Sequence, residues 1–146
     1  MRWLLATLVL LAGCASAPPS PAPQETALPA WYPQALDQLT ALNHAAEDDF
    51  QHGRSDDAAA KIKEAQPVAS RLLGVAKPSL PAVEAASDVD DLYGRMLLAN
   101  RNYGWAQMFF QKNRSRWKNW RPQTPEAERR FKLAESEIAE CDKHID

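Results

Sequence analysis

The chain has 146 residues, a formal net charge of −2 at pH 7, and 25% charged residues. A chain of this length can build one hydrophobic core but hardly two, so we expect a single folded domain. The charge is too small and of the wrong sign for a nucleic-acid-binding protein, and we expect no nucleic acid among its partners.

The first fourteen residues have the order of a secretory signal peptide. Arg2 is followed by an uninterrupted apolar run over residues 4–11, then Ala12, Gly13 and Cys14. The run is too short to span a bilayer as a stable helix. Its last residues, Leu11-Ala12-Gly13-Cys14, resemble the lipobox of bacterial lipoproteins. This resemblance implies that residues 1–13 are removed and that Cys14 carries the lipid which anchors the protein to a membrane.

The lipobox resemblance also implies a location in the bacterial cell envelope. Lipoproteins with Asp directly after the lipidated Cys are often retained in the inner membrane, whereas this chain has Ala15. We therefore expect an outer-membrane lipoprotein that faces the periplasm. Residues 14–30 hold five prolines among small and polar residues, which indicates a disordered linker ahead of a folded domain over residues 31–146.

Apolar residues at helical spacing predict that this domain is all-α. A first helix has a face that includes Leu36, Leu39, Ala46 and Phe50. Gly53 ends it, and Ser55 is the expected cap of a second helix. We expect Pro67 to kink this second helix or to end it near Ala65.

The second half of the chain predicts three more helices. Residues 74–87 contain two prolines and read as a connection, after which Asp88 is the expected cap of a third helix. Residues 102–104 form a turn, and residues 120–123 end a fourth helix. Thr124 caps the last helix with Pro125 at its first position. Cys141 belongs to the apolar stripe of this helix, which predicts a buried, inert thiol.

Two of these hairpins resemble tetratricopeptide repeats. The repeat signature is W-x2-L-G-x2-Y followed by A-x3-F. Tyr93, Gly94, Leu97, Ala106 and Phe110 occupy its later positions, although Asp90 replaces the Trp. A looser copy contains Ala46, Ala58 and Ile62. The copies are 48 residues apart against about 34 in an ordinary repeat, so we expect the 74–87 connection to supply the excess. The resemblance implies antiparallel helical hairpins with a C-terminal capping helix; an unrelated four- or five-helix bundle is the alternative.

Motifs of enzymes and cofactor sites are missing from the sequence, so we expect neither catalysis nor a cofactor. His44, Asp48 and His52 are spaced by four and would form a column on one helix face. Two imidazoles and a carboxylate so arranged could bind a metal ion, which makes a periplasmic metal-binding protein the alternative function. A solvated polar face is the simpler interpretation of the same pattern.

Charge is distributed unevenly along the domain. Residues 31–90 hold ten acidic and five basic residues, whereas residues 91–132 hold three acidic and ten basic ones. Within the basic block, Arg114, Arg116 and Arg121 alternate with Trp117 and Trp120. We expect these five residues to contact an anionic partner: lipid headgroups, a glycan or an acidic protein. Core tryptophans with flanking cations, or cations docked on the acidic first half, are the structural alternatives.

The sequence thus predicts a lipid-anchored envelope protein that acts as an interaction or assembly factor through a small helical domain. Its partners would be the membrane, through the lipid on Cys14, and an envelope protein.

Overall fold

The computed structural model describes residues 27–145, which fold into five α-helices without a β-strand in that range. The helices are α1 (Tyr32–Gln51), α2 (Ser55–Leu73), α3 (Leu80–Ala99), α4 (Tyr103–Asn119) and α5 (Pro125–Asp142). The all-α prediction is confirmed for this part of the chain. The predicted signal peptide and all but the last four residues of the linker lie outside the described residues.

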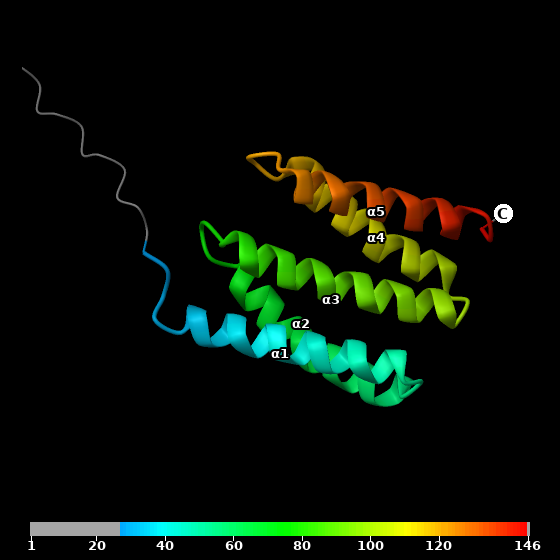
Figure 1. The fold of residues 1–146 in the computed structure, drawn as a ribbon, viewed down its shortest axis with the longest axis horizontal. Coiled ribbons are helices and arrows are strands. Elements are labelled where there is room, and N and C mark those ends of the chain that lie inside the picture. Colours follow the sequence, from blue (N-terminus) through cyan, green and yellow to red (C-terminus); the bar gives the residue numbers. More distant parts are fainter. Residues whose placement is uncertain (1–26, 146) are drawn as a thin grey trace, which may run out of the picture.

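Consecutive helices pack against each other in an up-and-down order (Figure 1). The central helix α3 lies against α1, α2 and α4, and α5 packs on α4. The start of α1, the α2–α3 loop and the α4–α5 loop therefore gather at one end of the molecule. We call this the proximal end and define it as residues 28–31, 71–79 and 118–124. The α1–α2 turn, the α3–α4 turn and the C-terminus lie at the opposite, distal end (Figure 1).

The turn between α1 and α2 forms where it was predicted. Gly53 has a φ of +73°, a conformation that a residue without Cβ adopts at little cost. The predicted cap is wrong, because Arg54 precedes the helix and Ser55 is already its first residue. Pro67 does not end α2, which continues to Leu73. Pro67 lies on the exposed side, and the buried Ala65, Ala69 and Leu72 hold the helix against its neighbours.

The third helix begins nine residues earlier than predicted. Ser79 caps α3 by accepting a hydrogen bond from the Ala82 amide, and Pro81 suits its first turn. Asp88, the predicted cap, lies inside the helix and pairs with Arg130. The connection is therefore six residues long, and it does not supply the extra length between the two repeat-like hairpins. That length belongs to the helices themselves.

The end of α4 and the start of α5 agree with the prediction, whereas α4 begins at Tyr103, inside the predicted turn over residues 102–104. The Thr124 hydroxyl accepts a hydrogen bond from the Ala127 amide at 3.1 Å, and Pro125 is the first residue of α5. Ala127, Ala134 and Cys141 are buried on one stripe of this helix. Burial raises the pKa of the Cys141 thiol, which keeps it protonated.

The core contains one position where two helices approach very closely. A Cβ built on Gly94 of α3 would lie 2.5 Å from the ring of Phe110 on α4, and Phe110 is fully buried. Only a glycine allows this approach. No helix within residues 27–145 is both long and apolar enough to cross a membrane.

Candidate functional site

A groove runs between α2 and α4, with α3 as its floor. Two adjoining depressions make up the groove, and Gln66 of α2 and Phe109 of α4 line both. The distal part is apolar and aromatic; its other lining residues are Tyr93, Leu97 and Trp105. The proximal part is more polar; its other lining residues are Ala69, Ser70, Leu73, Ala86, Val89, Asp90, Lys112 and Arg116.

The spacing of side chains on α4 builds one wall of the groove. Trp105, Phe109, Lys112 and Arg116 recur every three or four residues and therefore share one helix face. A second face of α4 includes Phe110, the residue directly after Phe109. This face is buried and holds α4 against α3 and α5. The groove face of α4 is thus aromatic toward its distal end and basic toward its proximal end, where Arg116 pairs with Asp90 of α3.

The aromatic part of the groove is open to solvent. The rings of Tyr93 and Phe109 meet edge to face, with centroids 4.8 Å apart. Trp105 is 62% exposed and its neighbour Met108 is 53% exposed. Exposed aromatic side chains beside a concave surface mark binding sites more often than isolated exposed apolar residues do.

The polar part of the groove is built around one buried carboxylate. Asp90 accepts hydrogen bonds from Lys112 Nζ at 2.9 Å and from Arg116 Nη2 at 2.7 Å. Its side chain is 7% exposed, and that of Arg116 is 12% exposed. Two cations thus compensate one buried anion. Lys112, at 57% exposure, keeps N–H donors available at the rim of the groove.

The predicted contact residues of the basic segment separate into interior and surface positions. Trp117 is 1% exposed and donates a hydrogen bond to the Ser87 hydroxyl at 2.8 Å. Because Arg116 is paired with Asp90, these two residues stabilise the fold and present no free surface to a partner. The prediction that cations dock on the acidic first half therefore describes Arg116 correctly.

The other three predicted contact residues are at least partly accessible. Arg114 forms an exposed ion pair with Glu135 at 3.3 Å. Arg121 donates to the backbone carbonyls of Lys118 and Trp120. Trp120 is half-buried and packs edge to face against Trp117. A partner of this segment would meet Arg114, Trp120 and Arg121.

The histidine column does not form a metal site. His52 contacts Asp48 at 3.3 Å, but Arg54 also pairs with this carboxylate, at 2.8 Å. Among residues 27–145, no group of three or more His, Cys, Asp or Glu side chains is arranged to hold a metal ion. These observations give no support to the alternative of a metal-binding protein. Cys14, the predicted lipidation site, lies outside the described residues.

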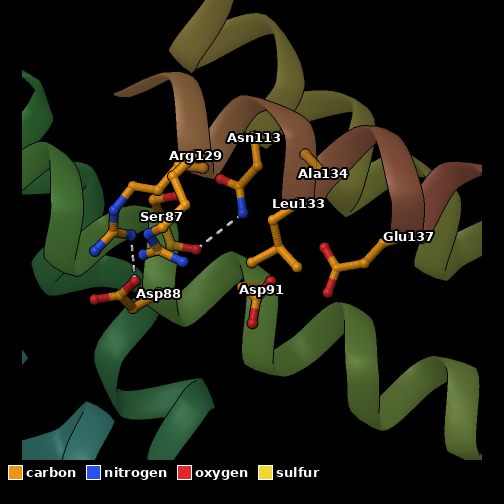
Figure 2. Close-up of a pocket in the computed structure, with 9 residues that line it drawn as sticks. Ser87, Asp88, Asp91, Asn113, Arg129, Leu133, Ala134 and Glu137 are labelled. Carbon is orange, nitrogen blue, oxygen red and sulfur yellow. Dashed lines mark hydrogen bonds and ion pairs between the residues drawn. The ribbon is translucent and has the colours of Figure 1, made fainter. Parts of the chain in front are cut away.

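A second, smaller cavity of about 60 Å³ lies between α3 and α5. Figure 2 shows Glu137 of α5 pointing toward α3, where Asp91 lies. Burial, together with the neighbouring Asp91 carboxylate, raises the pKa of Glu137 to about 8. Arg130 pairs with Asp88, and both residues line this cavity. The cavity holds water-sized molecules only, and its charged groups tie α5 to α3.

Sequence reasoning missed the groove between α2 and α4. One signal was present: Trp105 and Met108 are large apolar residues on the face of α4 that does not pack. Comparison with known proteins identified no relative, since no family model, no curated protein and no solved structure matches this chain.

Proposed function

We propose that this protein is a lipid-anchored, non-enzymatic interaction factor of the bacterial envelope, which binds a segment of a partner protein in the groove between α2 and α4. The observation that carries the proposal is the exposure of Trp105 beside the aromatic lining formed by Tyr93 and Phe109. Folding does not require Trp105 on this face, because α4 already buries its opposite face. An exposed indole at the edge of a groove is the residue type that most often dominates protein–protein binding.

The chemistry of the groove defines the partner segment. Its aromatic part matches apolar or aromatic anchors, and its rim presents Lys112, whose side chain is 57% exposed. We infer an amphipathic peptide segment with apolar side chains on one face and a carboxylate placed to meet Lys112. Charge complementarity of this kind favours an acidic segment over a basic one.

Several packing features support a tetratricopeptide-like arrangement of the first four helices. The predicted small-residue positions Ala46, Ala58 and Ala106 are fully buried, and Gly94 meets Phe110. The helix α3 contacts both helices of the preceding hairpin, as consecutive repeats do. In this interpretation α5 is the capping helix, and the groove lies between the second helices of the two hairpins.

The anchor is tested separately from the groove. We propose that Cys14 carries the lipid and that the protein resides in the outer membrane facing the periplasm. Cells fed an alkyne fatty acid should label the wild-type protein, and the Cys14→Ser variant should carry no label and leave the membrane fraction. Label that persists on this variant would contradict the anchor.

The groove is tested by placing a photoreactive amino acid at position 105 or, as a control, at position 133. Leu133 is also exposed, at 41%, but lies on α5 outside the groove. We expect the photoreactive residue at position 105, but not the one at position 133, to form a crosslink to a specific partner. The Lys112→Glu substitution should abolish this crosslink. The contacted segment is then synthesised as a peptide and titrated against the protein.

Trp105→Ala should weaken binding of this peptide by about 2 kcal/mol or more, whereas Leu133→Ala should leave the affinity unchanged. Both variants should keep the thermal stability of the parent, because both side chains are exposed. Equal affinity of the Trp105→Ala variant and the parent would refute the groove as the binding site.

A further inference from the structure

The proximal end gathers basic side chains from separate elements. Arg71 ends α2, Lys77 lies in the α2–α3 loop, and Lys118 and Arg121 flank the end of α4. All four are exposed, and none forms an ion pair with a carboxylate of the described residues. The distal end carries both signs of charge: its exposed acidic residues Asp48, Asp56, Asp57 and Asp142 lie among the exposed cations Arg54, Arg101 and Lys143. The domain therefore has a charge asymmetry along its long axis.

Contacts between the helix ends hold this basic surface together. Arg71 lies over the ring of Trp31 with its guanidinium carbon 3.9 Å from the ring centroid. The Ser79 amide donates a hydrogen bond to the Tyr32 hydroxyl at 2.9 Å, which joins the start of α1 to the α2–α3 loop. Trp120 packs in the same cluster as Leu73 and Leu80. The four cations are thus carried by a packed end of the domain.

Apolar and aromatic groups lie among these charges. Trp31 and Trp120 are half-buried, and Leu28 is 45% exposed where the chain enters the domain. Tryptophan rings prefer the boundary between water and an apolar phase, and arginine and lysine bind phosphate groups at that boundary. The combination fits the headgroup region of a membrane better than it fits a narrow peptide groove, because it spreads over several connections.

We propose that the proximal end is a docking surface for an anionic phospholipid bilayer. Cys14 is separated from Trp31 by a stretch that spans at most about 50 Å in extended proline-rich geometry. The lipid would hold the proximal end near the membrane, so weak headgroup contacts suffice to orient the domain. This tether depends on the lipidation proposed above, whereas the charge asymmetry does not. Docking in this way directs the distal end, with Trp105, away from the bilayer.

The electrostatic part is tested without the lipid, on the chain from residue 14 with Cys14→Ser. It should co-sediment with vesicles of phosphatidylglycerol, but not with vesicles of phosphatidylcholine, and 1 M salt should release it. A triple variant that combines Lys77→Gln, Lys118→Gln and Arg121→Gln should bind the phosphatidylglycerol vesicles about 100-fold more weakly, where each factor of ten corresponds to about 1.4 kcal/mol. The matched control, Lys63→Gln, Arg101→Gln and Lys143→Gln, should bind like the parent.

The orientation is tested by coupling the unmodified Cys14 to a maleimide lipid. Cys141 is fully buried and is protected from this reagent. With a paramagnetic headgroup label in phosphatidylglycerol vesicles, amide signals of residues 74–79 and 118–123 should broaden more than those of residues 52–57 and 100–103. The proposal would be overturned if the amide signals broadened uniformly, or if the protein bound both lipids equally. It would also be overturned if the two triple variants lost vesicle binding to the same extent. Fatty-acid labelling that fails while vesicle binding persists would refute only the anchor.

Discussion

Asp90 is the residue whose charge matters most to the packing of α3 on α4. Its carboxylate is almost fully buried and lies between Lys112 and Arg116. A buried ion pair is a weak source of net stability, but removal of one partner leaves the other charge buried and uncompensated. Arg116, at 12% exposure, is almost as buried as the carboxylate with which it pairs.

The Asp90→Ala variant should therefore lose about 3–5 kcal/mol of unfolding free energy, measured by urea denaturation. The matched control is Glu135→Ala, which breaks the exposed pair with Arg114 and should cost less than about 1 kcal/mol. Similar losses in the two variants would mean that Arg116 finds water or another partner.

Glu137 predicts a dependence of stability on pH. Its pKa is about 8 in the folded chain, against 4.5 for an ordinary Glu, because of burial and then Asp91. The folded state binds the extra proton between these two values, so the unfolding free energy should fall as the pH rises from about 4.5 to 8. Glu137→Gln should remove this fall and stabilise the protein at pH 9 by about 1–2 kcal/mol, after a discount for solvent screening. Thermal melts from pH 5 to pH 9 measure the effect, and parallel pH profiles of variant and parent would contradict it.

At the scale of elements, the crossing of α3 and α4 depends on Gly94. An added methyl group would collide with the ring of Phe110, which is fully buried. Gly94→Ala should therefore destabilise the protein by about 1–3 kcal/mol.

Gly104→Ala is the matched control for this crossing. Gly104 lies in the first turn of α4, and a Cβ there meets nothing within 4 Å. The added methyl group should be neutral or stabilise the helix by up to about 1 kcal/mol. Equal effects of the two substitutions in chemical denaturation would show that the helices separate easily at this crossing.

For the whole molecule, the packing order predicts where the fold is most stable. The helix α3 contacts α1, α2 and α4, whereas α5 packs mainly on α4. Amide protons of α3 should exchange with solvent only through global unfolding, and those of α5 should exchange through a smaller opening. Native-state hydrogen exchange measures the two free energies, and faster exchange in α3 than in α5 would be inconsistent with this packing.

The sequence by itself determined the class of the fold and most helix boundaries. Helical spacing of apolar residues specifies which faces are buried, and local chemistry such as the Thr124 cap and Gly53 specifies the ends. It did not show that α2 continues past Pro67 to Leu73, or that α3 starts at Leu80. Packing of Ala65, Ala69 and Leu72 overrides the local preference of a proline, and the Ser79 cap with Pro81 starts α3 early.

Only the tertiary structure decided which charged and aromatic side chains remain available. The sequence left open whether Arg116 and Trp117 contact a partner or belong to the interior, because linear spacing does not reveal that Asp90 and Ser87 of α3 lie opposite them. Trp105 reads as one more aromatic residue, yet it is left outside the core at the groove between α2 and α4. The physical reason is that burial and pairing depend on contacts between helices far apart in sequence, which the period of a single helix does not contain.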